Sequence, residues 1–236
     1  MTERRRLLLM RHGAVDYFAP DGQPYRPTEV PLTQQGIAQA RAIGTALLQG
    51  SVQIDRVITS GLVRTRSTAE HVMAAGSIPA PVEHWPDLQE IRGGKLGAIP
   101  EAQLRDAFIA PFAGPVPLET QFLGGETVGQ LLDRVIPALQ RLLAQEDWDT
   151  ALLVLHGGVN RALLSWLLTG QRLFFGGFEQ AHGCLNVVDV GGSTASTIVR
   201  MLNYCPLDTL HTSTRLSPME TLLARYHSAR ERRLAG

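Results

Sequence analysis

The 236-residue chain has few cysteines, a single lysine and no excess of either charge. Its two cysteines, Cys184 and Cys205, provide neither a disulfide framework nor the ligand pattern of a zinc site, so we expect small buried thiols. Twenty-two basic residues balance 22 acidic ones, which excludes an overall field that attracts nucleic acid or an anionic membrane. Because the net charge is zero, any site for an anion has to be built locally; nearly all the basic residues are arginines, with Lys95 as the only lysine.

Long hydrophobic runs are also lacking. No stretch approaches the ~18 consecutive apolar residues of a membrane span. The basic cluster Arg4–Arg6 and the apolar run Leu7–Met10 resemble a signal peptide, but the run is shorter than the roughly 7–15 residues required and no small-residue cleavage site follows. We therefore expect a cytoplasmic protein with no nucleic-acid or membrane partner. The length and the 44% hydrophobic content fit one globular domain over residues 1–236.

Short apolar runs alternate with segments of helical periodicity along the chain. The most continuous run, Thr150–Leu155, is typical of a strand buried on both faces. Two apolar segments on either side of Gly191–Ser193 predict a β-hairpin. The alternation predicts an α/β fold: a three-layer α/β/α sandwich with a mostly parallel central sheet and an antiparallel edge. We expect strands at residues 7–10, 54–59, 82–85, 150–155, 184–190 and 196–202, and helices at 33–50, 62–75, 101–112, 126–142 and 159–169.

Two further segments stand apart from this alternation. The proline-rich stretch Ala14–Pro31 predicts a long loop, which is either functional or mobile. Residues 203–236 form a C-terminal extension in which Ser217–Glu220 predicts a capping box and the start of a helix. We expect this helix to pack on the domain or on a partner subunit, which leaves a homodimer open.

Two of the expected strands end in the dipeptide His-Gly. One strand leads into Arg11–Gly13 and the other into His156–Gly158. Core packing does not explain this repetition, because a buried imidazole needs hydrogen-bond partners. Ligands of open α/β sheets bind beyond the carboxyl ends of the strands. We therefore expect His12 and His156 to meet in one crevice.

The same crevice should contain two arginines. Arg64 lies in the first turn of the helix after the second strand, at the sheet end that also carries Arg11. Two guanidinium groups suit bidentate capture of a phosphate, and the amides of Gly157 and Gly158 add a helix N-terminus. An imidazole beside that phosphate can attack phosphorus, while a second one hydrogen bonds to the oxygens. The pattern therefore predicts phosphoryl transfer.

A leaving alkoxide needs a proton, and the donor can later activate water. Glu90 is our candidate for this role, because it follows the third strand and lies in a loop at the same end of the sheet. Glu83, Asp87 and Glu126 are its rivals. Of these, Glu126 is better explained as an acid in the first turn of a helix, where the macrodipole favours it.

These residues occur in five motifs that, in this order, resemble the histidine phosphatase superfamily, the group that contains the cofactor-dependent phosphoglycerate mutases. The resemblance spans roughly residues 5 to 190. It implies a phosphohistidine intermediate on His12, phosphate binding by Arg11, Arg64 and His156, proton transfer by Glu90, and neither metal nor cofactor. The motifs are Leu9–Gly13, Ser60–Ala69, Leu88–Glu90, Gly124–Thr127 and Val154–Gly158.

Two departures from the mutase pattern favour hydrolysis. The mutases follow Arg-His-Gly with a polar residue and, further on, an asparagine that helps to hold phosphate, whereas this chain has Ala14–Phe18. Gly61 stands where the family usually has an acidic residue after the serine. The resemblance therefore implies a metal-independent phosphatase that acts on a small phosphorylated metabolite.

Three alternatives stay open. A mutase would return the phosphoryl group from the same intermediate to the substrate. A binding module would keep the pocket without turnover. A metal hydrolase would use His12, Asp16 and His156, although no paired metal-ligand spacing supports it.

Residues outside the expected phosphate site are assigned structural, surface or entrance-lining roles. We expect His182 to be structural. The loop Ala14–Pro31 is expected to line the entrance and to favour a substrate with an apolar or ring-bearing part, through Tyr17, Phe18, Tyr25 and Arg26. Four further basic residues could extend the positive pocket, but we expect each to be solvated or salt-bridged at the surface, namely Arg66, Arg92, Lys95 and Arg161.

Overall fold

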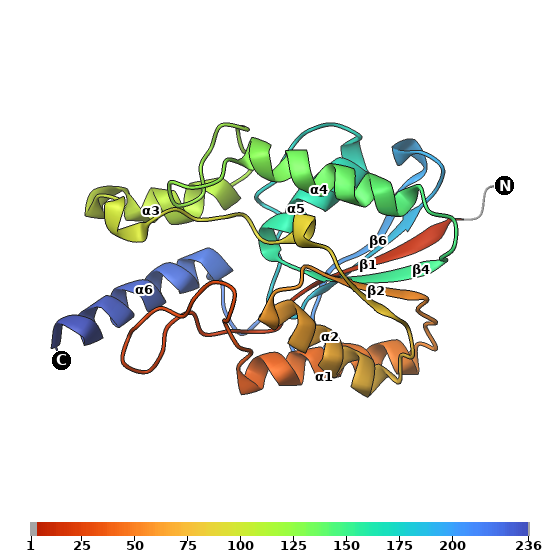
Figure 1. Ribbon diagram of the computed structural model, residues 1–236, viewed down its shortest axis with the longest axis horizontal. Coiled ribbons are helices and arrows are strands. Elements are labelled where there is room, and N and C mark those ends of the chain that lie inside the picture. Colours follow the sequence, from red (N-terminus) through yellow and green to blue (C-terminus); the bar gives the residue numbers. More distant parts are fainter. Residues whose placement is uncertain (1–3, 236) are drawn as a thin grey trace.

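The computed structural model describes residues 4–235 and is built around one six-stranded sheet (Figure 1). The strand order is β3-β2-β4-β1-β5-β6. The first four of these strands are parallel, β5 runs antiparallel to β1, and β6 runs antiparallel to β5. The mostly parallel sheet with an antiparallel edge is therefore confirmed. The strands are β1 (Arg5–Arg11), β2 (Arg56–Thr59), β3 (Val82–His84), β4 (Thr150–Leu155), β5 (Leu185–Val190) and β6 (Ile198–Tyr204).

Helices cover both faces of the sheet, as Figure 1 shows. On one face lie α1 (Gln34–Gln49) and α2 (Val63–Gly76), and on the other α4 (Val128–Leu143) and α5 (Gly157–Thr169). Thr33 is the N-cap of α1 as expected, since its hydroxyl accepts a hydrogen bond from the Gly36 amide at 3.1 Å. Because helices pack on both faces of the sheet, the predicted three-layer α/β/α sandwich is confirmed.

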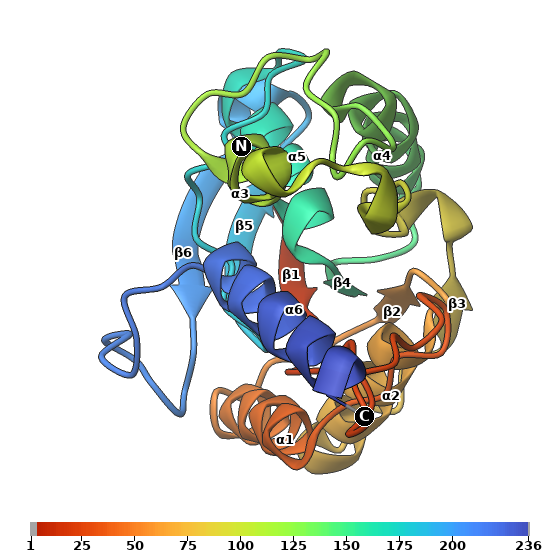
Figure 2. The ribbon, with the colours of Figure 1, turned by 90° about the vertical axis from the view of Figure 1, so that its left-hand side faces the viewer.

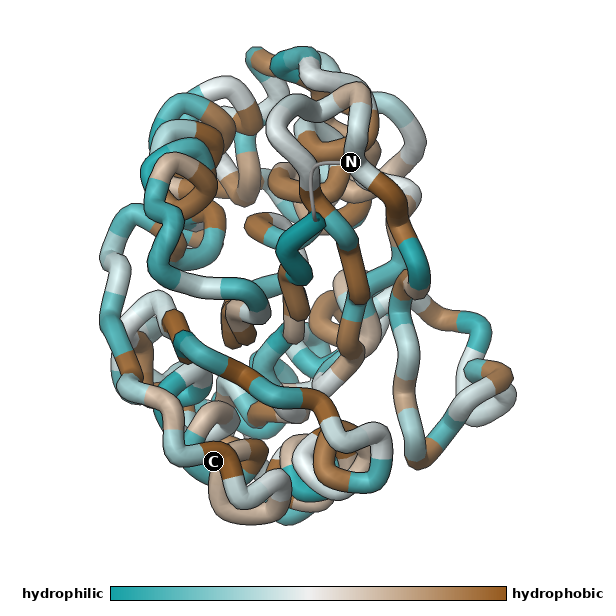
Figure 3. The backbone as a smooth tube through the Cα atoms, turned by 90° about the vertical axis from the view of Figure 1, so that its right-hand side faces the viewer, coloured by the Kyte–Doolittle hydropathy of each residue, from teal (hydrophilic) through white to brown (hydrophobic). Residues whose placement is uncertain are grey.

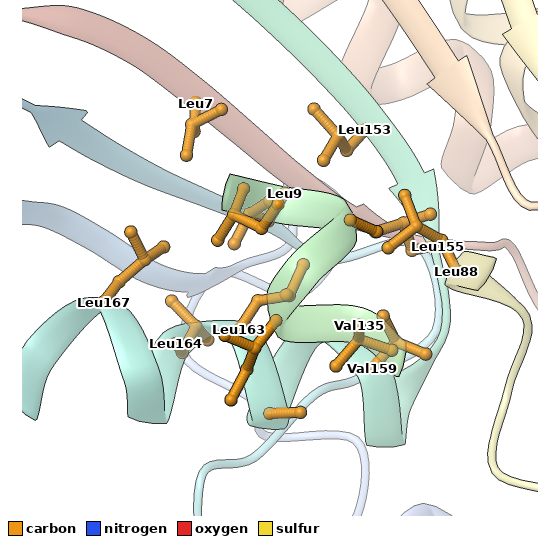
Figure 4. Close-up of a cluster of buried hydrophobic side chains, with 14 of the residues drawn as sticks. Leu7, Leu9, Leu88, Val135, Leu153, Leu155, Val159, Leu163, Leu164 and Leu167 are labelled. Carbon is orange, nitrogen blue, oxygen red and sulfur yellow. The ribbon is translucent and has the colours of Figure 1, made fainter. Parts of the chain in front are cut away.

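The central strands are apolar throughout because each of their faces packs against a helix layer. In β1, Leu7 and Leu9 join the cluster that contains α4 and α5, whereas Leu8 and Met10 join the cluster that contains α1 and α2. Figure 4 shows the strand leucines facing Val159 and other apolar side chains of α5. Figure 3 shows the same arrangement along the chain, with hydrophobic residues gathered on the inner strands.

A third apolar cluster lies beyond the carboxyl ends of the strands. It joins α3 (Glu101–Ile109) to α6 (Pro218–Ala235), with Phe108 and Tyr226 at its centre. The expected capping box starts α6, because the Ser217 amide donates to Glu220 Oε2 at 2.8 Å and the Glu220 amide donates to Ser217 Oγ at 3.2 Å. Figure 2 shows α6 crossing in front of the sheet, so the C-terminal helix packs on the domain and partly covers that end.

None of the helices within residues 4–235 combines the length and the hydropathy that a membrane span requires.

Candidate active site

His12 and His156 lie side by side at the carboxyl ends of β1 and β4. The two strands are adjacent and in register, with Arg11 opposite Leu155, so the next residue of each chain segment reaches the same level. The two ring centroids are 5.4 Å apart at an interplanar angle of 67°. Both side chains are almost completely buried. The predicted meeting of the two histidines is therefore present in the structure.

The ring of His12 is held in one tautomer. Its Nδ1 lies 2.8 Å from the carbonyl oxygen of Gly13, and a carbonyl can only accept, so Nδ1 carries the proton. Nε2 then keeps a free lone pair. Burial lowers the pKa of His12 well below its ordinary value, and the nearby charges of Arg64 and Arg11 lower it further. The ring is therefore neutral, as a nucleophile has to be.

The two expected arginines flank the histidines, and each is anchored by its outer nitrogens. Arg11 donates from Nη1 to the Gln180 carbonyl at 2.6 Å, and its Nη2 lies 3.0 Å from Nε2 of His182. Arg64, in the first turn of α2, donates from Nη1 to the Pro27 carbonyl at 2.7 Å. Within residues 4–235 the buried Nε–H groups of both arginines have no hydrogen-bond partner. Two charged donors are thus buried and available to an anion.

His156 presents a further unpaired nitrogen. Its Nε2 lies 2.8 Å from Oγ of Ser60, and its buried Nδ1 contacts no acceptor or donor among the described residues. Burial lowers the pKa of His156 well below its ordinary value, and Arg64 and Arg11 add to this effect. When the Ser60 hydroxyl donates to Nε2, Nδ1 keeps its proton and can donate to an anion. The sequence analysis missed this role of Ser60, although its position directly after β2 was a usable signal.

The two glycines after His156 have different tasks. A Cβ atom on Gly157 would lie 3.4 Å from Nε of Arg11 and 3.2 Å from Nη1 of Arg161, so glycine leaves room for the guanidinium groups. A Cβ on Gly158 would lie 2.6 Å from Oε1 of Glu90. The Gly158 amide donates to both carboxylate oxygens of Glu90 at 3.1 Å. The expectation that this amide faces a phosphate is wrong, because Glu90 occupies it.

Glu90 is therefore fixed at the N-terminus of α5, beside the arginine site. The Gly158 amide and the amide of Ile91, which donates to Oε1 at 3.0 Å, hold the carboxyl group in one orientation. Leu88 and Ile91, on either side of Glu90 in the chain, are buried in the main apolar cluster and anchor the loop. The predicted carboxylate thus lies next to the Arg11 and His156 segments of the chain, as expected.

Arg134 of α4 holds the loop from the other side. It donates to the carbonyls of Gln89 at 2.6 Å and Glu90 at 3.0 Å, and it forms an ion pair with Glu126 at 2.8 Å. Burial alone would raise the pKa of Glu126, but hydrogen bonds from Arg134 and from the Arg92 amide outweigh it and lower the pKa. Glu126 is accordingly a partner of Arg134. The other rivals also have structural partners, Glu83 with Arg56 and Asp87 with Arg141.

The arginines open into a cavity of about 990 Å³. Arg11, Arg64 and Glu90 contribute to its inner wall. The loop 14–31 and residues 205–225, which include the start of α6, contribute many of its other lining residues, and Phe108, Phe112 and Phe122 line it as well. The aromatic side chains of the loop that line it are Tyr17, Phe18 and Tyr25.

Two further residues, Arg26 and Arg161, differ from expectation. The side chain of Arg26 is 82% exposed and pairs with Glu29, so the expectation that it lines the entrance is wrong. Arg161, expected at the surface, is 5% exposed and donates from Nε to the Gly176 carbonyl at 2.9 Å. Burial and the charge of Arg11 lower its pKa to about 10. His182, which was expected to be structural, lies beside Arg11, with its Nε2 3.0 Å from Nη2 of the arginine.

The geometry gives no support to a metal centre at these residues. Asp16, the proposed third ligand, forms an ion pair with Arg225 at 2.8 Å and has a 59% exposed side chain. Over residues 4–235, no group of three or more His, Cys, Asp or Glu side chains is arranged to hold a metal ion.

Several known proteins that resemble this chain in sequence are phosphatases. A curated adenosylcobalamin/alpha-ribazole phosphatase from Salmonella typhimurium is 30% identical over 193 residues, which cover 78% of this chain and 90% of that one. A metal-independent phosphoserine phosphatase from Arabidopsis thaliana is 31% identical over 169 residues, covering 69% and 68%. Phosphoglycerate mutases are also among the relatives.

Solved structures share the fold. The alpha-ribazole phosphatase from Shigella flexneri superposes with a TM-score of 0.64 at 25% identity, over 84% of this chain and 96% of that one. The family description "Histidine phosphatase superfamily (branch 1)" matches residues 7–203. This match spans most of the sequence and includes Arg11, His12, Arg64, Glu90 and His156. The chain therefore belongs to the histidine phosphatase superfamily.

Proposed function

We propose that the protein is a metal-independent phosphatase that hydrolyses a phosphomonoester through a phosphohistidine on His12. One observation carries this proposal: the unprotonated Nε2 of a buried, neutral His12 lies among two buried arginines whose Nε–H groups have no partner within residues 4–235. A nucleophile and a dianion site in one place are what phosphoryl transfer to nitrogen requires.

In the first step, Nε2 of His12 forms a bond to phosphorus while the ester P–O bond breaks. The electron pair of that bond stays on the leaving oxygen, which takes a proton from Glu90. For this step the carboxyl group of Glu90 has to carry the proton, and a substrate that arrives as the phosphate monoanion can deliver it while it binds as the dianion. The product alcohol then leaves.

In the second step, Glu90 takes a proton from a water molecule that attacks the phosphorus. The N–P bond breaks, its electron pair returns to Nε2 of His12, and inorganic phosphate is released. Arg11, Arg64 and Nδ1–H of His156 would hold the three phosphoryl oxygens, because charge accumulates on them in both transition states. The amide of Gly157, at the N-terminus of α5, is the remaining backbone donor that we assign to substrate binding.

A mutase is the nearest alternative, since it shares the first step. The segment Ala14–Phe18 argues against it, because none of its side chains supplies the amide that the mutases place there. Gly61 argues in the same direction. It adopts φ = +82°, a backbone conformation that favours glycine, so the turn before α2 does not suit the acidic residue that the family usually has at this position. A binding module is less well supported, because Glu90 accepts hydrogen bonds from the amides of Ile91 and Gly158 and from Arg134, which a passive phosphate site does not need.

For the substrate, we propose a small phosphorylated metabolite with an apolar or ring-bearing part. The cavity of about 990 Å³ has room for much more than a phosphate, and Tyr17, Phe18 and Tyr25 line it. The α-ribazole phosphatases among the relatives make α-ribazole 5′-phosphate one compound to include in a trial, and the Arabidopsis relative adds phosphoserine.

The test is turnover by the purified protein in the presence of EDTA, with p-nitrophenyl phosphate and a panel of phosphorylated metabolites. We expect release of inorganic phosphate that EDTA leaves unchanged, with no isomer of the substrate formed. Formation of a phosphate-shifted isomer without net phosphate release would instead identify a mutase. Loss of activity in EDTA would support the metal hydrolase.

A further inference from the structure

His182 stands next to the phosphate site without a role in the proposed reaction. It lies in the segment between α5 and β5, is half-buried, and lines the main cavity. Its ring centroid is 5.7 Å from that of His12, at an interplanar angle of 57°. A third histidine at this place needs an explanation.

The contact between His182 and Arg11 fixes the protonation of the imidazole. Nε2 of His182 lies 3.0 Å from Nη2 of Arg11, and a guanidinium group has only donors. Nε2 must therefore accept, so it carries no proton and the ring is neutral with its proton on Nδ1. Burial lowers the pKa of His182 well below its ordinary value, and Arg11 and then Arg225 lower it further, in agreement with this assignment.

The segment Gln180–His182 anchors two of the three nitrogens of Arg11. Nη1 donates to the Gln180 carbonyl at 2.6 Å, and Nη2 donates to His182. Because each Nη has two N–H groups, one N–H of Nη2 stays available beside the unpartnered Nε–H. Those two parallel donors form the edge of a guanidinium that binds two oxygens of one phosphate. Arg11 is thus anchored through Nη1 and one N–H of Nη2, and among the described residues its Nε–H and the other N–H of Nη2 are free to bind the phosphate.

The anchoring segment is itself rigidly attached to the sheet. The side chain of Gln180 is buried and exchanges hydrogen bonds of 3.0 and 2.9 Å with Asn186 of β5. Nδ2 of the Asn186 side chain in turn donates to the Leu9 carbonyl of β1 at 2.8 Å. On the other side, the Gly183 amide donates to the His12 carbonyl at 3.0 Å. The position of His182 is therefore tied to the backbone of the nucleophile.

We propose that His182 is a positioning residue that orients Arg11 for phosphate by accepting a hydrogen bond at Nε2. The inference rests on the proposed function, since it concerns the same phosphate site. It assigns to the Gln180–His182 segment the task of fixing the guanidinium plane, so that Nε and Nη2 face the phosphoryl oxygens. Without the acceptor at Nε2, Arg11 keeps its charge but loses one of its two anchors.

The test uses three substitutions of the full-length protein. His182→Gln places an acceptor oxygen near the position of Nε2, whereas His182→Asn retains a group near Nδ1 only, and His182→Ala removes both. The matched control is His71→Ala, a half-buried histidine on α2 with no role in the site. The measurements are kcat and KM for p-nitrophenyl phosphate, the inhibition constant of inorganic phosphate, and the melting temperature.

We expect His182→Ala and His182→Asn to lower kcat/KM by about 10- to 100-fold and to weaken phosphate inhibition by about 10-fold, the loss expected for a charge-assisted contact. His182→Gln should stay within about threefold of the wild type in both measurements, as an acceptor is retained. His71→Ala should match the wild type. Equal melting temperatures for Gln and Asn would show that the difference between them does not come from folding.

Two results would overturn the inference. Wild-type phosphate inhibition and turnover in all three variants would show that Arg11 needs no anchor at His182. Wild-type turnover and phosphate inhibition in His182→Asn, with a loss in His182→Gln, would show that Nδ1 of His182 matters and not Nε2. If His182→Ala fails to fold, the Gln and Asn pair still decides. Failure of the proposed function is separate: the wild type would then hydrolyse no phosphomonoester, while titration with inorganic phosphate would still compare the variants.

Discussion

The inner pocket and the outer wall of the cavity are built in different ways. We define the inner pocket as Arg11, His12, Arg64 and His156, and the outer wall as residues 14–31 and 205–225. The inner pocket is buried, and its side chains follow or adjoin the carboxyl ends of neighbouring parallel strands. Because the sheet register sets their positions, few other arrangements are open to them.

The outer wall joins two segments that lie far apart in the sequence. Tyr226 of α6 packs at 6.3 Å between ring centroids against Phe18 and at 6.0 Å against Phe108 of α3. Arg225 pairs with the exposed Asp16 at 2.8 Å. Leu207 and Leu210 are 61% and 83% exposed. Under the proposed function, the strand ends would carry the chemistry, whereas the choice of substrate would depend on surface segments, which can vary without disturbing the strand ends.

The most drastic way to break the inner pocket is to remove its nucleophile. His12→Ala deletes the atom that forms the bond to phosphorus, so we expect at least ~10⁴-fold lower turnover of p-nitrophenyl phosphate. The melting temperature should stay near that of the wild type, with His71→Ala as the control. Wild-type hydrolysis by the His12→Ala protein would contradict the mechanism.

The proton donor comes next. Glu90→Gln keeps the shape of the side chain but can neither give nor take the proton, so we expect kcat to fall by about 10²–10³-fold. The loss should be larger for alkyl phosphates than for p-nitrophenyl phosphate, whose leaving group needs little help with a proton. Single-turnover kinetics should also show a longer-lived phosphoenzyme. Equal losses for both kinds of ester would argue against Glu90 as the acid.

The support of Glu90 can be weakened without touching the pocket. Glu126→Ala leaves the half-buried Arg134 without its ion-pair partner, and we expect a loss of about 2 kcal/mol in the free energy of unfolding. Because Arg134 then holds the Gln89 and Glu90 carbonyls less firmly, kcat should fall about 10-fold. Urea unfolding and steady-state kinetics measure the two effects. A destabilised variant with unchanged kcat would show that the loop does not depend on this ion pair.

A change in the outer wall should leave the chemistry intact. Tyr17→Ala removes an aromatic side chain from the cavity, so we expect kcat/KM to fall about 10-fold for a ring-bearing phosphate ester relative to phosphoserine. The inhibition constant of inorganic phosphate should not change. Arg26→Ala, on the same loop but exposed, is the matched control. Unchanged selectivity in Tyr17→Ala would refute the proposed role of the loop.

Acid should lower the free energy of unfolding through three histidines at the site, and each should contribute less than the Glu126→Ala substitution does. Because the folded-state pKa values of His12, His156 and His182 are lowered, the unfolded chain binds more protons below its own histidine pKa of about 6.5. Stability should therefore fall as the pH drops through 6.5, by about 0.7 kcal/mol per histidine between pH 7 and pH 6. Urea unfolding at both pH values tests this, and His12→Gln should remove one of the three contributions.

The sequence predicted the inner pocket better than the outer wall, and the reason is physical. Strand ends in a parallel sheet share one edge, so the positions of Arg11, His12 and His156 directly after apolar runs imply that they meet. The role of His182 could not be predicted in this way, because it depends on how the segment after α5 folds back to Arg11. The occupation of the Gly158 amide by Glu90 depends likewise on a loop from elsewhere in the chain.

For the outer wall, the amino-acid composition of the loop was the only basis for a prediction from the sequence. Aromatic residues in the loop 14–31 predicted a lined entrance, but Arg26 faces outward and the contribution of residues 205–225 was not foreseen. Surface loops have no register that fixes which side chains turn inward. The cytoplasmic location and the homodimer stay predictions, as neither follows from the arrangement of one chain.

The most direct test of the account is to trap the covalent intermediate. Wild-type and Glu90→Gln protein would be mixed with a phosphoryl-labelled substrate, quenched in base within milliseconds, and digested for mass spectrometry. We predict one phosphoryl group per chain, stable in base and labile in acid as a phosphoramidate is, located on His12 and more abundant in the Glu90→Gln protein. Turnover without label on His12, or label on a different residue, would contradict the account.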